Sequence, residues 1–95
     1  MATYIILSRL AHNAFRDPKE FRRIANDVAA RIKKNCPNVR WKASYGTLGQ
    51  YDVVDVVESD DLSQIERAAL IIRSQGHATT ETMIATPWKE FLKKL

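Results

Sequence analysis

The chain has 95 residues, of which 45% are apolar and 27% are charged, and its formal net charge is +4. This length allows one two-layer core, and this composition excludes long disordered segments. The single cysteine, Cys36, excludes an internal disulfide and suits a reducing compartment. We find no signal-peptide pattern and no apolar run of membrane-spanning length. We therefore expect one cytoplasmic domain over residues 1–95.

Apolar periodicity predicts four strands and three helices. The first helix begins at Asp17 and Pro18, because aspartate caps free backbone N–H groups and proline suits the first helical position. Pro37 ends this helix, since proline cannot continue it. Its apolar stripe consists of Phe21, Ile24, Ala25, Val28, Ala29 and Ile32. The predicted elements are strand 3–10, helix 18–35, strand 39–47, strand 53–58, helix 62–75, strand 77–86 and a short helix over 87–92.

The order β-α-β-β-α-β predicts an α+β fold. Right-handed crossovers turn it into a four-stranded antiparallel sheet of order 4-1-3-2, with both helices on one face. By alternation we expect the other face to carry Tyr4, Ile6, Val53 and Val57, covered only where the C-terminal helix reaches. An apolar patch of that size predicts a homodimer packed sheet to sheet.

The hairpin segment also carries a family resemblance. The turn Leu48-Gly49-Gln50-Tyr51-Asp52 leads into a valine strand ending in Glu58, and Thr80-Glu81-Thr82 follows in the last strand. The chain resembles the GYD-domain family, with the signature present as Gly49, Tyr51 and Asp52 and with Gln50 interposed. The resemblance implies a ferredoxin-like fold assembled as a dimeric α+β barrel. Such barrels include cofactor-free monooxygenases, isomerases, haem proteins and regulator domains, so the fold alone assigns no reaction.

Asp55 is the principal candidate for chemistry, because it lies mid-strand among valines. By alternation we place it with Tyr51, Val53 and Val57 on the face that a dimer would close. A carboxylate there must be paired, hydrogen-bonded or protonated. It is either a catalytic general base or ligand anchor, or a structural hydrogen-bond acceptor, with Lys42 or a tyrosine as donor. The candidate polar partners in a pocket are Tyr4, Tyr45 and Tyr51.

The signature residues have two interpretations. In a pocket, Tyr51 would stack on a ligand and Asp52 would accept its hydrogen bonds. In a turn, Gly49 would supply a positive φ and Asp52 would satisfy nearby backbone N–H groups. Glu81 likewise either faces a ligand pocket or pairs with Arg9 on the neighbouring strand.

His12, His77 and Glu58 are weak metal candidates. We expect the sheet topology to bring them to one edge, where two histidines and a carboxylate could hold a metal with open positions. No fixed spacing supports such a site, and two surface histidines are the simpler interpretation. We predict no metal and no cofactor.

Nucleic-acid binding is a competing hypothesis, because the RNA-recognition domain has the same β-α-β-β-α-β order. The third strand carries valines where stacking aromatics are wanted, and Asp52, Asp55 and Glu58 would repel phosphates. Nucleic acid is therefore disfavoured. We predict a homodimeric domain that binds an unidentified small molecule at the sheet or dimer cleft. The alternatives are a cofactor-independent enzyme, monooxygenase- or isomerase-like, using Asp55 or a histidine, and an RNA-binding or protein-interaction module.

Overall fold

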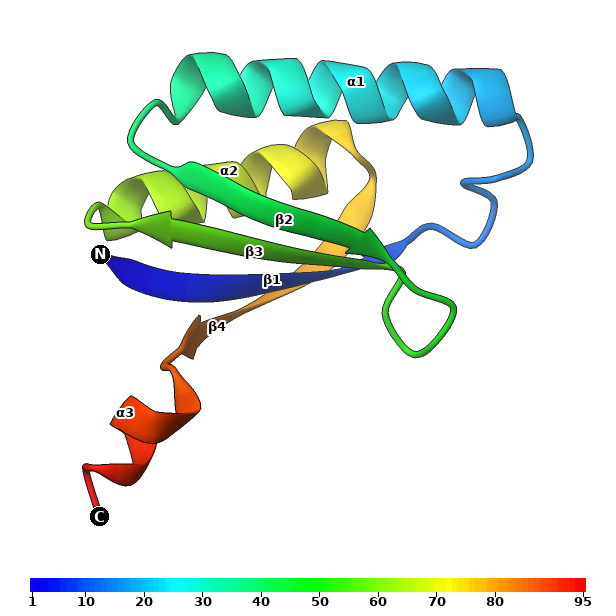
Figure 1. The fold of residues 1–95 in the computed structure, drawn as a ribbon. Coiled ribbons are helices and arrows are strands. Elements are labelled where there is room, and N and C mark those ends of the chain that lie inside the picture. The colour runs from blue at the N-terminus through cyan, green and yellow to red at the C-terminus, as the bar shows by residue number, and fades with distance from the viewer.

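A computed structural model describes residues 1–95 (Figure 1). Its elements are β1 (Ala2–Leu10), α1 (Pro18–Asn35), β2 (Arg40–Gly46), β3 (Val53–Ser59), α2 (Leu62–Gln75), β4 (Ala78–Ala85) and α3 (Trp88–Leu92). All strand pairs are antiparallel, in the order β2-β3-β1-β4. This is the predicted 4-1-3-2 order counted from the other edge, so the predicted α+β fold is confirmed. Helices α1 and α2 cover the same face of the sheet (Figure 1).

The core lies between the sheet and α2. Ile6 of β1 and Val57 of β3 are completely buried, and Ile65 and Ala68 of α2 cover them. Burying each of these branched side chains contributes about 1.5–3 kcal/mol. Helix α2 packs on β3 and β4, whereas α1 packs chiefly against α2. Of all α1 residues only Ile32 is buried, so most of the apolar stripe of α1 is incompletely covered.

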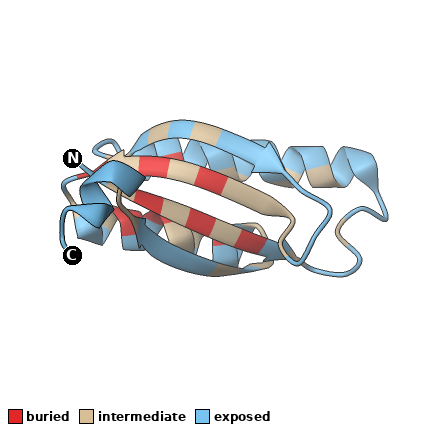
Figure 2. Cartoon of the chain, turned by 60° about the horizontal axis from the view of Figure 1, so that its bottom comes forward, coloured by how far each residue is buried: buried red, intermediate tan, exposed pale blue.

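The predicted assignment of sheet faces is wrong. Tyr4, Ile6 and Val57 point toward the helices, and they belong to the core. Val53 and Asp55 are in phase with Val57, so they also lie on the helix side and not on the face that a dimer would close. The face without helices, which we call the open face, carries the residues that alternate with them (Figure 2). Its apolar members, partly buried or exposed, include Ile5, Leu7, Val54, Val56 and Met83. Both faces of β1 and β3 are apolar, so the alternation identifies the two sets but not which of them meets the helices.

Strand β2 contains a register shift between Trp41 and Ala43. Trp41 lies opposite Val57 and Ser44 lies opposite Asp55, so both point to the helix side although they are three residues apart. Ala43 and Tyr45 therefore lie on the open face, and not with Trp41 as alternation predicts. A bulge of this kind inserts one residue and redirects the side chains that follow it.

The loop between β2 and β3 is one residue longer than the predicted turn over 48–52, since β2 ends at Gly46 and β3 begins at Val53. Gly49 does not have a positive φ, so the conformational reason expected for this glycine is wrong. His77, which follows α2, has a left-handed backbone conformation with φ of 53°. Gly76 caps α2 in a right-handed conformation.

Helix α3 leaves the body of the molecule after β4 and does not cover the sheet as expected (Figure 1). Trp88 is 70% exposed, and its ring stacks on Phe91 with centroids 6.0 Å apart. Together with the exposed Leu92 and Leu95, these side chains form an apolar arm adjoining the open face. None of the helices is both long and apolar enough to span a membrane.

Candidate functional site

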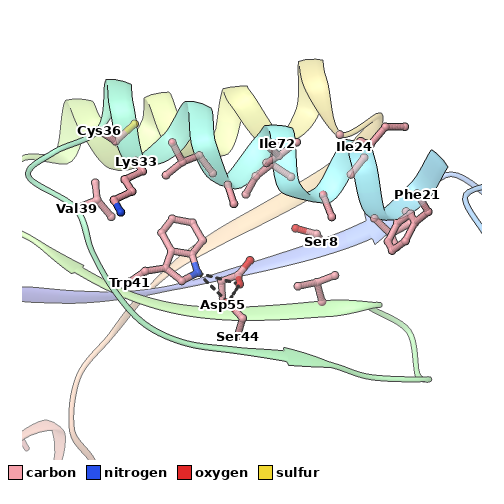
Figure 3. Close-up of a pocket in the computed structure, with 18 of the residues that line it drawn as sticks. Ser8, Phe21, Ile24, Lys33, Cys36, Val39, Trp41, Ser44, Asp55 and Ile72 are labelled. Atoms are coloured by element: carbon pink, nitrogen blue, oxygen red, sulfur yellow. Dashed lines mark hydrogen bonds between the residues drawn. The ribbon is translucent and has the colours of Figure 1, made fainter. Parts of the chain in front are cut away.

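A cleft of about 610 Å³ lies between α1 and the sheet (Figure 3). The predicted apolar stripe of α1 forms its roof, and strands β1, β2 and β3 form its floor. The C-terminal end of α1 and the loop after it are tied to α2, because Arg67 donates to the Asn35 carbonyl at 3.2 Å and Gln64 accepts from Asn38 N–H at 2.8 Å. Ala25 and Ala29 also lie on the roof, and neither is buried.

The floor of this apolar cleft carries a carboxylate. Asp55 is 5% exposed, and its Oδ1 accepts hydrogen bonds from Ser44 Oγ at 2.6 Å and from Trp41 Nε1 at 3.2 Å. The bulge in β2 is what places both donors beside Asp55. Both bonds end on Oδ1, and Oδ2 has no hydrogen-bond partner in the protein. Oδ1 of Asp55 is therefore held by two hydrogen bonds, whereas Oδ2 can accept a hydrogen bond from a ligand in the cleft.

Burial raises the pKa of the Asp55 carboxyl, and the hydrogen bonds from Ser44 and Trp41 oppose that shift. Desolvation disfavours the charged form of a carboxyl group, whereas donors that point at the carboxylate stabilise it. The net direction is upward, so Asp55 holds its proton at a higher pH than an ordinary aspartate does. Such a group can anchor a ligand or exchange a proton with it.

Ser8 of β1 is a further polar group on the floor, apart from Asp55 and Ser44 (Figure 3). It is 2% exposed, and its Oγ has no hydrogen-bond partner in the protein. Nearly all buried polar atoms in folded proteins are hydrogen-bonded, so an unpaired hydroxyl facing a cleft is notable. Ser8 is two residues along β1 from Ile6, which lies opposite Asp55. The hydroxyl and the carboxylate are thus diagonal neighbours on the helix side of the sheet.

The cleft contains only one of the residues predicted from the sequence, Asp55. Tyr4 lies in the core and borders a separate hollow beneath α2. Tyr45 is 59% exposed on the open face. Neither is the polar partner of Asp55, and sequence reasoning missed the actual partners, Trp41 and Ser44. Ser8 was also missed, although it is in phase with Tyr4 and Ile6 and so is expected to point inward with them.

The signature residues lie at the hairpin end of the open face. Asp52 Oδ2 accepts a hydrogen bond from Leu10 N–H at 2.8 Å, which ties the loop to β1. The hydroxyl of Tyr51 donates to the Glu81 carboxylate, and this bond raises the pKa of Tyr51. The Arg9 guanidinium lies 5.6 Å from the centre of the Tyr51 ring. Glu81 is thus bonded to Tyr51 and not to Arg9, as the alternative of a cross-strand ion pair would require.

The expected gathering of His12, His77 and Glu58 is wrong. Glu58 pairs with Thr3 near the start of β1, because β3 is antiparallel to β1. Both histidines flank the other end, where Leu10 of β1 pairs with Ala78 of β4. No group of three His, Cys, Asp or Glu side chains is placed to hold a metal ion.

Comparison with known proteins places the chain in a family. The sequence profile of the GYD domain matches residues 4–95. The chain belongs to the GYD-domain family. A GYD relative from Thermus thermophilus, named glutamine synthetase and cystathionine beta-lyase binding protein, is 31% identical over 99 residues, covering 100% of this chain and 99% of the relative.

Two solved structures resemble this GYD chain. The crystal structure of FFRP-DM1 has a TM-score of 0.51 and 26% sequence identity, and the match covers 90% of this chain and 100% of that one. A hypothetical protein from Pyrococcus horikoshii has a TM-score of 0.48 and 23% identity, with 92% of each chain covered. The first of these structures supports the same small α+β fold.

Proposed function

We propose that this GYD protein is a homodimeric module that binds a small molecule in the cleft beneath α1. The observation that carries the proposal is the pair of polar groups without hydrogen-bond partners, Ser8 Oγ and Asp55 Oδ2, on the floor of an apolar cleft. The cleft volume of about 610 Å³ lies in the usual range for small-molecule sites, roughly 300–1,000 Å³. Such sites combine apolar walls with a few polar groups that orient the ligand.

The dimer would form through the open face. Large apolar patches rarely stay exposed on a soluble monomer, and a second copy offers a matching patch under two-fold symmetry. The apolar arm around Trp88 and Phe91 adjoins this face, and in a dimer it would pack on the partner copy. The two clefts would remain accessible, because they lie on the opposite side of each sheet. The unpaired Cys36 fits a cytoplasmic location.

Native mass spectrometry of gently purified, untagged protein tests both parts of the proposal. We expect a dimer with a reproducible additional mass. Ala29→Phe places a ring in the cleft, and it should remove that mass while the dimer persists. Ala30→Phe is the matched control, because Ala30 is an exposed neighbour on α1 that does not line the cleft. An additional mass retained by Ala29→Phe, or a monomer at micromolar concentration, would contradict the proposal.

A protein partner is the second candidate. The name of the Thermus thermophilus relative, which aligns over 99% of its length, supports binding to an enzyme such as glutamine synthetase or cystathionine beta-lyase. Surface plasmon resonance with these two purified enzymes tests this candidate. Binding that is unaffected by Ala29→Phe would assign the partner to another surface. No binding to either enzyme would remove the support drawn from the relative.

An enzyme that uses Asp55 is the third candidate, because its raised pKa suits proton exchange with a ligand in the cleft. Asp55→Asn separates this candidate from a binding module. An enzyme would lose turnover of the bound molecule and still bind it, whereas a binding module would show no turnover in either form.

A further inference from the structure

The polar floor of the cleft restricts the chemistry of the ligand, an inference that rests on the proposed function. We infer that the cleft selects an apolar molecule carrying one uncharged hydroxyl group, which bridges Ser8 Oγ and Asp55 Oδ2. A hydroxyl donates one hydrogen bond and accepts others at the same oxygen. It can therefore accept from Ser8 and donate to the free oxygen of Asp55, so that both groups gain a partner.

The placement of the two groups fits a single bridging oxygen. Asp55 lies opposite Ile6, and Ser8 lies opposite Val53, so the two side chains are diagonal neighbours on adjacent strands. Such neighbours have Cα atoms roughly 7–8 Å apart and side chains closer still. One oxygen with two hydrogen bonds of about 2.8 Å spans up to about 5.5 Å. Figure 3 shows both side chains pointing into the space beneath α1.

Charged ligands fit this floor poorly. A carboxylate would face the Asp55 side chain, and the one basic residue of the lining, Lys33, lies at the Cys36 end of the cleft beyond Trp41 (Figure 3). An ammonium group would be attracted by the Asp55 carboxylate, but it has three donors to satisfy, and the acceptors without partners here are Asp55 Oδ2 and Ser8 Oγ. An ammonium would also be desolvated by apolar walls. A neutral hydroxyl carries neither penalty.

Four probes of similar size test the inference: 2-naphthol, 2-methylnaphthalene, 2-naphthoate and 2-(aminomethyl)naphthalene. Each is titrated into the uniformly ¹⁵N-labelled protein. The indole N–H signal of Trp41 reports on the cleft, because Trp41 Nε1 donates to both Ser44 Oγ and Asp55 Oδ1. The indole N–H of the exposed Trp88 on α3 is the internal control, and Trp88→Phe assigns the two signals.

We expect 2-naphthol to bind at least about tenfold more tightly than 2-methylnaphthalene, and the two charged probes to bind more weakly than 2-naphthol. Ser8→Ala should reduce the affinity for 2-naphthol to that for 2-methylnaphthalene, and it should leave the latter unchanged. The matched control is Ser63→Ala, because Ser63 is exposed on α2 and does not line the cleft. This control should leave both affinities unchanged.

Each opposite outcome has a distinct meaning. Equal binding of 2-naphthol and 2-methylnaphthalene, tighter binding of either charged probe, or no effect of Ser8→Ala would overturn the hydroxyl inference while the proposed binding function stands. If none of the four probes shifts the Trp41 signal up to its solubility limit, both the inference and the proposed cleft site fail.

Discussion

Removing the Ser8 hydroxyl should stabilise the protein. Ser8 is 2% exposed, and its Oγ has no hydrogen-bond partner in the protein. A buried polar group in that state costs about 1–3 kcal/mol relative to a satisfied one. Ser8→Ala removes the group at almost constant side-chain volume, so the free energy of unfolding should rise by about 1 kcal/mol or more. For a domain of this size that increase raises Tm by about 4–8 °C per kcal/mol.

Ser59→Ala is the matched control, since Ser59 is 1% exposed and also lies on a strand. Its Oγ donates to the Asn38 carbonyl at 2.7 Å and accepts from Asp61 N–H at 2.9 Å. Alanine there leaves both backbone groups without that partner, so the free energy of unfolding should fall by about 1–3 kcal/mol. The change from serine to alanine should thus raise the free energy of unfolding at Ser8 and lower it at Ser59, although both serines are buried to a similar degree.

Urea unfolding of the ligand-free protein, followed by tryptophan fluorescence, measures both variants. The protein concentration is held constant, because the stability of a dimer depends on it. A loss of stability in Ser8→Ala comparable to that in Ser59→Ala would refute the reasoning. It would mean that Ser8 Oγ is satisfied in the folded protein, and the cleft would lose its unpaired hydroxyl.

Three further predictions concern pH, backbone and assembly. Because the pKa of Asp55 is raised by burial, the folded state holds this proton more tightly than the unfolded state. The unfolding free energy should therefore fall as pH rises from about 3.9 through the folded pKa, and Asp55→Asn should lack this decline in urea titrations across pH. Gly49→Ala should change stability by less than about 1 kcal/mol, because Gly49 has no positive φ and no atom within 4 Å of an added Cβ. Gly76→Ala should lower the free energy of unfolding by about 1–3 kcal/mol, because its Cβ would lie 2.6 Å from the Ile72 carbonyl oxygen. Equal denaturation midpoints for the two alanine variants would contradict this contrast. Val56→Lys on the open face should give a monomer in light scattering, and a persistent dimer would exclude that face.

The sequence was sufficient to predict the elements and their order, because the signals were local. Asp17 caps α1 by accepting from the N–H groups of Lys19 and Glu20, as its position before Pro18 indicates. The two-fold alternation also placed Tyr4 and Ile6 on one face correctly. It could not tell which face meets the helices, since Ile5 and Leu7 make the other face apolar as well.

The site was predictable only in part. Asp55 was identifiable because a carboxylate among valines must have a special environment. Its donors were not, because the bulge that directs Ser44 toward Asp55 leaves the polar and apolar alternation of β2 unbroken. The family signature drew attention to Tyr51 and Asp52, whose observed contacts tie the hairpin to β1 and β4.

A crystal structure of the untagged protein, purified without added ligands, tests the central claim most directly. We predict two copies joined through their open faces and electron density for a bound molecule between Ser8 and Asp55 beneath α1. A copy in which α1 rests directly on the strands, so that Phe21, Ile24 and Val28 fill the cleft, would contradict the account.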